Sequence, residues 1–268
     1  MISVFQSIIL GIVQGATEFI PVSSSGHLVL VPWLLGWQEP GLVFDTVLHL
    51  GTLLAVLLVF WRDLVLLASA WLRSLADRRP NSNARLAWWV LLGTLPAAAM
   101  GALFESRFEA LFSSPRHVAI FLLVTGAWLL FVERAGRGGG LAQDLDWWQA
   151  LLIGFAQGIA IAPGISRSGA TIGAGMTLGL KREESARFSF LLALPIILGA
   201  GLLQARDLVA SPNVSAQILP LALGFLAAFA TGYVCIRFLL AYLRRHTMLP
   251  FAGYCWLLGL VALAVAVL

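Results

Sequence analysis

Charged residues are scarce in this chain of 268 residues. Lys, Arg, Asp and Glu make up 11% of it, whereas 60% of the residues are hydrophobic. Soluble globular domains carry about 25% charged residues and about 45–50% apolar ones. The scarcity of charge therefore excludes an ordinary soluble domain, and the long apolar runs indicate an all-α polytopic membrane protein.

Cysteine is also rare, and this excludes further classes. Cys235 and Cys255 lie inside apolar runs, where a cysteine is ordinarily a small buried hydrophobe. No cluster of cysteines and histidines has the spacing of a zinc site. The first residues lack a basic segment followed by a cleavage site, so we expect no removable signal peptide. The net charge of +4 lies mostly in loops, so we expect no nucleic-acid partner.

Six apolar stretches are long enough to cross a bilayer, which takes about 20 helical residues. Two further apolar regions, 1–37 and 147–180, are each interrupted by a cluster of Pro, Ser and Gly. An irregular turn at membrane depth is tolerated only where it is buried in protein or lines a wet cavity. We therefore expect each of these regions to be a re-entrant helical hairpin. The six spanning stretches are 44–61, 86–104, 117–133, 188–204, 218–236 and 250–268.

Loop charges predict the orientation of these segments. Loops 62–85, 134–146, 181–187 and 237–249 hold 13 of the 17 Lys and Arg residues, whereas loops 105–116 and 205–217 hold three. The positive-inside rule places the first set in the cytoplasm. The alternation then requires that both hairpins be re-entrant, the first opening to the outside and the second to the cytoplasm. Within a single domain, 1–268, the halves 1–133 and 147–268 are thus predicted to form an inverted-topology repeat.

The two hairpins also share a motif at a constant offset of 143 residues. The differences between the copies are Glu18 opposite Ile161, His27 opposite Ala170 and Ser24 opposite Arg167. One half supplies a carboxylate and an imidazole, and the other a guanidinium, which predicts one site at the interface of the halves. The matching positions are Gly11, Gln14, Gly15, Ser23, Ser25 and Gly26 in the first copy, and Gly154, Gln157, Gly158, Ser166, Ser168 and Gly169 in the second.

Glu18 and Arg167 are charges within apolar hairpins, where each costs at least ~2.5–3.5 kcal/mol. We expect them to meet, either as an ion pair that only fixes the fold or as part of a functional site. A Ser/Gly turn before a helix exposes N–H groups to an anion, and an Arg fork suits phosphate oxygens. The alternative role of such a turn is helix capping. The candidate phosphate-binding residues are Ser23, Ser25, Gly26, Ser166, Ser168 and Gly169.

Two further side chains, those of Gln14 and His27, are candidates for chemistry. Gln14 and Glu18 are four residues apart on one helix face, so their oxygens could hold a divalent cation such as Mg2+ or Ca2+. His27 follows Ser24 by three residues and is a candidate general acid or base. Asp45 and His49, at the start of the first full span, could support the site residues, but polar residues at the membrane interface are the commoner case.

The strings Gln14-Gly-Ala-Thr-Glu-Phe-Ile-Pro-Val-Ser-Ser-Ser-Gly-His27 and Pro163-Gly-Ile-Ser-Arg-Ser-Gly-Ala-Thr171 resemble the signatures of bacterial undecaprenyl pyrophosphate phosphatases, the bacitracin-resistance type. The resemblance implies an inner-membrane hydrolase that makes undecaprenyl phosphate, the lipid carrier for peptidoglycan synthesis. It implies a divalent cation, held on the side of Gln14 and Glu18, and a site open to the periplasm. It also implies that Glu18, Ser24, His27 and Arg167 are catalytic, with Arg167 as the residue that binds phosphate.

Several alternatives stay open. Ser24 either attacks phosphorus or positions a water that His27 activates. The same repeat suits a transporter or flippase of an anionic polyprenyl phosphate lipid. Expected partners are the undecaprenyl pyrophosphate substrate, membrane lipids and, as an option, a second copy of the chain in a homodimer.

Overall fold

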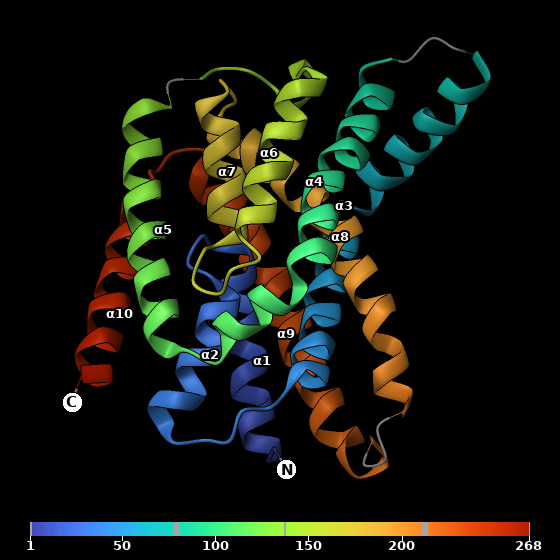
Figure 1. Ribbon diagram of the computed structural model, residues 1–268. Helices are drawn as coiled ribbons and strands as arrows, with labels where there is room; N and C mark the ends of the chain where they lie inside the picture. Colours follow the sequence, from blue (N-terminus) through green and yellow to red (C-terminus); the bar gives the residue numbers. More distant parts are fainter. Residues whose placement is uncertain (1, 78–80, 137, 211–213, 268) are drawn as a thin grey trace.

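The computed structural model describes residues 2–77, 81–136, 138–210 and 214–267. Across these ranges the chain is helical and contains no strand beyond one isolated bridge between Gly140 and Leu180 (Figure 1). This confirms the all-α prediction. The helices are α1 (Val4–Phe19), α2 (Ser24–Leu35), α3 (Leu42–Asp77), α4 (Ser82–Phe112), α5 (Pro115–Ala135), the 3-10 turn η1 (Ala142–Asp144), α6 (Trp147–Ile159), α7 (Arg167–Thr177), α8 (Arg182–Ala210), α9 (Val214–Leu243) and α10 (Leu249–Val267).

Six helices are long and apolar enough to cross a membrane, and they coincide with the six predicted stretches. Five of them are longer than predicted, and α10, with 19 residues, has the predicted length. Helix α3 continues through much of the predicted loop 62–85, because residues 62–77 contain neither Gly nor Pro to end it. Helix α8 likewise occupies most of loop 181–187 and the start of loop 205–217. Residues 78–80 and 211–213 of these loops lie outside the described residues.

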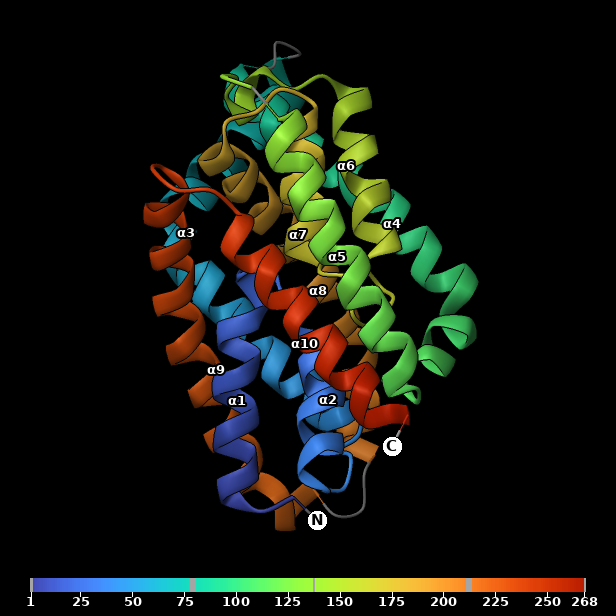
Figure 2. The ribbon, with the colours of Figure 1, turned by 90° about the vertical axis from the view of Figure 1, so that its left-hand side faces the viewer.

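Four short helices form two hairpins. Helices α1 and α2 have 16 and 12 residues, and α6 and α7 have 13 and 11, so each is shorter than the ~20 residues that a span needs. Figures 1 and 2 show α1 rising from the N-terminus to the middle of the molecule and α6 descending to the middle from the opposite end. The turns of the two hairpins meet there. Their re-entrant placement in a bilayer stays a prediction.

Each hairpin packs against a span from the other half of the chain. Helix α1 lies along α9, α6 lies along α4, and α5 runs beside α10 (Figure 2). The same order of helices therefore occurs twice, with opposite direction, and each half completes the packing of the other. The division into repeats 1–133 and 147–268 stays an interpretation of this order.

The glycines of the shared motif permit this close packing. A Cβ added to Gly15 on α1 would lie 2.5 Å from the carbonyl oxygen of Ala228 and 2.7 Å from the amide nitrogen of Gly232, both on α9. On α6, Gly154 is in the same way pressed against the backbone of Gly93 on α4. Small residues let helix backbones approach closely in membranes, where packing replaces the hydrophobic effect between helices.

A buried aromatic cluster ties the first hairpin to the spans. The ring of Phe19, at the end of α1, meets Phe190 of α8 edge-on with centroids 5.3 Å apart. Phe190 in turn meets Phe60 of α3 at 6.4 Å. All three rings are about 1% exposed, so the end of α1 is held by well-packed neighbours.

We predict that Gly15→Ala lowers the thermal unfolding temperature of the detergent-solubilised protein. The added methyl meets backbone atoms that cannot move aside, and such overpacking costs about 1–3 kcal/mol. Gly253→Ala is the matched control, because a Cβ at that helical position has open space around it. Equal melting temperatures for the two variants would contradict this account of the α1–α9 contact.

Candidate active site

The turns of the two hairpins are joined directly by hydrogen bonds. The N–H of Gly164, in the second turn, donates to the hydroxyl oxygen of Ser23 in the first, over 3.1 Å. The hydroxyl of Ser168 donates to the carbonyl oxygen of Ile20 over 3.3 Å. The residues that flank Glu18 and Arg167 are therefore held in one unit, although they are about 140 residues apart in sequence.

Helix α5 supports the second turn from behind. The hydroxyl of Thr125 donates to the carbonyl oxygen of Gly164 over 2.9 Å and accepts the N–H of Ser166 over 3.2 Å. The indole N–H of Trp128 donates to the carbonyl oxygen of Gly169 over 3.1 Å. The Thr125 bonds satisfy backbone groups that the irregular turn would otherwise leave unpaired inside the protein, and the Trp128 bond anchors the first turn of α7.

Glu18 is the centre of the site. Its side chain is 3% exposed, and its oxygen Oε1 accepts an Nη2 hydrogen bond from Arg167 in a salt bridge. The other oxygen, Oε2, accepts the hydroxyl of Ser24 and the amide Nε2 of Gln14, the latter over 3.0 Å. The Nε2 atom of His49, on α3, lies 3.6 Å from the same oxygen. Four elements thus converge on one buried carboxylate.

Arg167 is the first residue of α7, and its side chain is 19% exposed. While Nη2 contacts Glu18, Nη1 is buried and has no hydrogen-bond partner among the described residues. A guanidinium presents its donors as a planar fork that fits two oxygens of a phosphate. One nitrogen of that fork therefore has unused donors, although the atom is not exposed at the surface.

The serines of the shared motif cap the helices. The hydroxyl of Ser23 accepts the N–H of Gly26 over 3.3 Å at the start of α2, and that of Ser166 accepts the N–H of Gly169 over 3.0 Å at the start of α7. Such caps contribute about 0.5–2 kcal/mol each. These four residues therefore take part in helix capping. Their role as phosphate ligands stays a prediction, and the capping bonds count against it because they already occupy the hydroxyl and N–H groups concerned.

Ser25 differs from the other predicted phosphate ligands. Its side chain is half-buried, whereas Ser168 is 4% exposed and already joins the two turns. Ser24 and Ser25 are the first two residues of α2, where backbone N–H groups have no acceptor within the helix. Together with Arg167, these two serines form the part of the predicted site that a ligand can reach.

His27 does not contact Ser24 or Glu18. Its Nδ1 lies 2.7 Å from the carbonyl oxygen of Ser23, and its Nε2 lies 2.7 Å from the hydroxyl of Tyr254 on α10. Both ring nitrogens are engaged elsewhere, so the ring presents no free nitrogen to Ser24, and its role as general acid or base stays a prediction. The histidine that adjoins Glu18 is His49.

Sequence reasoning missed Tyr254, and for His49 it preferred an interfacial position to a place beside the site. Asp45 and His49 are four residues apart at the start of a span, and Nδ1 of His49 bonds to the carbonyl oxygen of Asp45 over 2.8 Å. That pair of polar residues on one face was the signal, and it was interpreted as an interfacial feature. Tyr254 carried no comparable signal, because a single Tyr in an apolar span is ordinary.

The predicted cation ligands fit a metal only in part. In the described residues no group of three His, Cys, Asp or Glu side chains could hold an ion. Glu18 is already neutralised by Arg167, and Gln14 turns its Nε2 toward it. Oε1 of Gln14, however, is buried without a partner, so one oxygen ligand is free beside the carboxylate. A cation here would have to obtain most of its ligands from the substrate.

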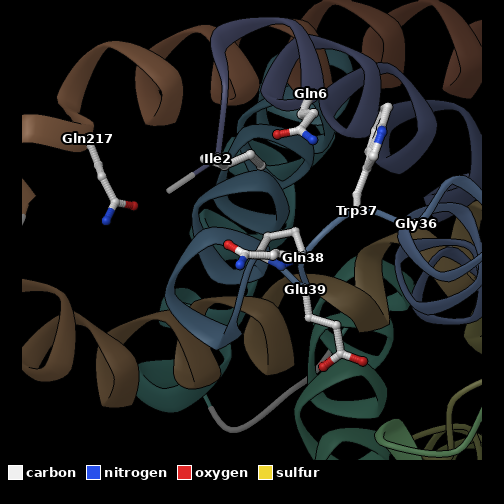
Figure 3. Close-up of a pocket in the computed structure, with 8 residues that line it drawn as sticks. Ile2, Gln6, Gly36, Trp37, Gln38, Glu39 and Gln217 are labelled. Atoms are coloured by element: carbon white, nitrogen blue, oxygen red, sulfur yellow. The ribbon is translucent and has the colours of Figure 1, made fainter.

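A separate cavity of about 460 Å3 lies at the far end of the first hairpin (Figure 3). It is formed where α1 begins and α2 ends, and Gln6, Trp37, Glu39 and Gln217 are among its lining residues. None of the predicted site residues lines it, so we do not assign it to the site.

The fold and this centre define a polytopic α-helical membrane protein with a serine, a carboxylate and a guanidinium gathered between two opposed hairpins. The family model described as bacitracin resistance protein BacA matches residues 7–261, and the chain belongs to this family. It is similar to proteins named undecaprenyl-diphosphatase from Rubrobacter xylanophilus (45% identity, all of both chains) and Methanosphaera stadtmanae (42% identity, all of this chain and 99% of the relative). A third, from Moorella thermoacetica, is 43% identical over 98% of both chains.

We predict that Arg167→Ala destabilises the protein by about 3 kcal/mol, because it leaves the buried Glu18 carboxylate without its counter-ion. Adding Glu18→Gln should restore much of the lost stability, since the buried charge is then removed. Thermal unfolding of the single and double variants in detergent measures both effects. A double variant that melts no higher than Arg167→Ala would show that the pair is not what holds this region.

Proposed function

We propose that this chain is an undecaprenyl-diphosphatase, which hydrolyses undecaprenyl pyrophosphate to undecaprenyl phosphate and inorganic phosphate. The family and the names of the relatives support this activity. The structural observation that carries the proposal is the hydrogen bond from Ser24 to Glu18. Glu18 is also paired with Arg167, and one nitrogen of Arg167 has no hydrogen-bond partner among the described residues. In the cell, the reaction recycles the lipid carrier for peptidoglycan synthesis and underlies bacitracin resistance.

The geometry supports Ser24 as the nucleophile. Its hydroxyl donates to Glu18, which can accept the proton as the oxygen attacks the terminal phosphorus. The bond from that phosphorus to the bridging oxygen breaks, and its electron pair leaves with undecaprenyl phosphate. Water then releases phosphate from the serine. Phosphoryl transfer of this kind depends mainly on positioning and on neutralising charge.

Arg167 provides most of that charge neutralisation. When its fork binds phosphate oxygens, its hold on Glu18 weakens, and the carboxylate becomes a better proton acceptor for Ser24. Ser25 and the free N–H groups at the start of α2 add donors on the same side. Substrate binding would thereby prepare the base that the reaction needs.

A divalent cation is part of the proposal. Gln14, through its unpartnered Oε1, and Glu18 would hold Mg2+ or Ca2+ together with substrate oxygens. The cation would supply further neutralisation of the pyrophosphate charge.

The site is proposed to open to the periplasmic side of the bacterial inner membrane. Helices α3, α5 and α9 end, and α4, α6 and α10 begin, in the upper half of the molecule in Figure 1. The predicted loops at these helix ends, 62–85, 134–146 and 237–249, hold 10 of the 17 Lys and Arg residues. The positive-inside rule makes that end cytoplasmic. The first hairpin, which opens at the other end, would then face the periplasm. The lipid tail stays in the bilayer, and a homodimer stays a prediction.

The family and the names of the relatives favour a phosphatase over the transporter alternative. The family and its relatives are named for resistance and for diphosphatase activity, and the contact of Ser24 with a buried carboxylate gives hydrolysis a chemical basis.

We predict that purified protein releases phosphate from undecaprenyl pyrophosphate and that Ser24→Ala lowers kcat by at least about 100-fold, as expected when an activated nucleophile is lost. Ser7→Ala is a matched control, because this buried serine bonds to the carbonyl of Pro220 away from the site. Phosphate release by colorimetric assay measures both. Near-normal turnover by folded Ser24→Ala would instead assign the attack to water.

We predict that Gln14→Glu lowers the cation concentration needed for half-maximal activity, because a second carboxylate adds an anionic oxygen ligand beside Glu18. The measurement is activity against Mg2+ and Ca2+ concentration after treatment with chelator. A wild-type enzyme that is indifferent to chelator would refute the cation requirement, and an unchanged midpoint in Gln14→Glu would remove Gln14 from the cation site.

A further inference from the structure

The residue before the proposed nucleophile has a strained backbone. Ser23 has φ 70° and ψ 93°, and it is the one non-glycine residue with positive φ in the described part of the chain. Residues other than Gly rarely adopt this backbone conformation, and it persists only where the surrounding structure holds it. Because Ser23 directly precedes Ser24, its conformation sets the direction in which the Ser24 hydroxyl points.

The His27 ring holds the carbonyl group of this strained residue. Nδ1 lies 2.7 Å from the Ser23 carbonyl oxygen, and the ring is buried. A carbonyl oxygen can only accept a hydrogen bond, so a proton is on Nδ1. In the neutral ring, Nε2 is then the acceptor. The amide N–H of His27 also donates to the Ser23 carbonyl, over 3.2 Å. Both contacts act on the same peptide unit.

Tyr254 fixes that ring from α10, a helix of the other half of the chain. Its hydroxyl lies 2.7 Å from Nε2 of His27, which it can reach as a donor. The two rings are also stacked, with an interplanar angle of 4° and centroids 5.6 Å apart. A donor at Nε2 selects the tautomer with hydrogen on Nδ1, which is the tautomer that the Ser23 carbonyl requires.

We propose that Tyr254 is a positioning residue for the diphosphatase reaction. It fixes His27, His27 holds the carbonyl of Ser23 in its strained conformation, and Ser23 presents Ser24 to the terminal phosphate. His27 is then also a positioning residue, and Glu18 takes the proton of Ser24. This inference rests on the proposed function.

Two substitutions of His27 separate positioning from proton transfer. In His27→Asn the side-chain amide nitrogen replaces Nδ1 and can still donate to the Ser23 carbonyl, but it cannot act as acid or base. We expect His27→Asn to keep kcat within about tenfold of wild type and His27→Leu to lose at least about 100-fold. Loss of acid–base catalysis costs about 10²–10⁴-fold, so a catalytic His27 would make both variants equally poor.

Tyr254→Phe removes the hydroxyl and keeps the ring. We expect kcat to fall about three- to tenfold with little change in KM, because Arg167 and Ser25 are untouched. The effect should largely vanish in a Ser23→Gly background, since Gly adopts positive φ without help. Tyr242→Phe is the matched control: Tyr242 stacks on His246 with centroids 4.6 Å apart, at residues outside the site.

Ring nitrogen signals test the contact without turnover. In 15N-histidine spectra of the full-length protein in detergent, we expect His27, assigned by its loss in His27→Asn, to show hydrogen on Nδ1. Tyr254→Phe should shift this signal toward a mixture of tautomers, whereas Tyr242→Phe should leave it unchanged.

Three results would overturn the inference: His27→Asn as inactive as His27→Leu, an undiminished effect of Tyr254→Phe in the Ser23→Gly background, or hydrogen on Nε2 of His27 in the wild type. Wild-type protein that releases no phosphate would refute the proposed function and, with it, the catalytic part of this inference. The ring signals would still report whether Tyr254 holds His27, so the two failures are distinguishable.

Discussion

The buried carboxylate of Glu18 is the constraint on which the rest of the centre depends. A charge at 3% exposure within apolar hairpins requires a counter-ion and hydrogen-bond donors, and the chain supplies them from Arg167, Ser24 and Gln14. Arg167 belongs to the other hairpin, so this requirement brings the two halves together. The same pair that stabilises the interface also leaves one guanidinium nitrogen free for an anion.

The irregular turns impose a second requirement, because their backbone groups lie inside the protein. The hydroxyls of Ser23 and Ser166 each accept one N–H from the first turn of α2 or α7, and Thr125 of α5 satisfies two backbone groups of the second hairpin turn. The repeated serines are therefore largely structural. Neighbouring residues provide the hydrogen bonds that the buried backbone groups need. Ser24 and the few other accessible groups are therefore free to take part in the proposed reaction.

Much of this could be predicted from the order of residues. The six spans, the two broken regions and the meeting of Glu18 with Arg167 follow from hydropathy and from the cost of isolated charges in a membrane. The neighbours of His27 could not be predicted. His27 follows Ser24 by three residues, but its ring contacts Tyr254, which is 227 residues away in sequence. His49 was undervalued because it comes from a third helix.

The sequence by itself determined the class of protein, its repeated hairpins and the identities of its charged and nucleophilic groups, since composition and spacing are local properties. Only the tertiary structure decided which serines cap helices and which stay partly exposed, which histidine lies beside Glu18, and why Gly15 and Gly154 recur. The reason is physical: capping, burial and close helix contact depend on which surfaces of distant segments meet, and residues far apart in the chain supply those surfaces.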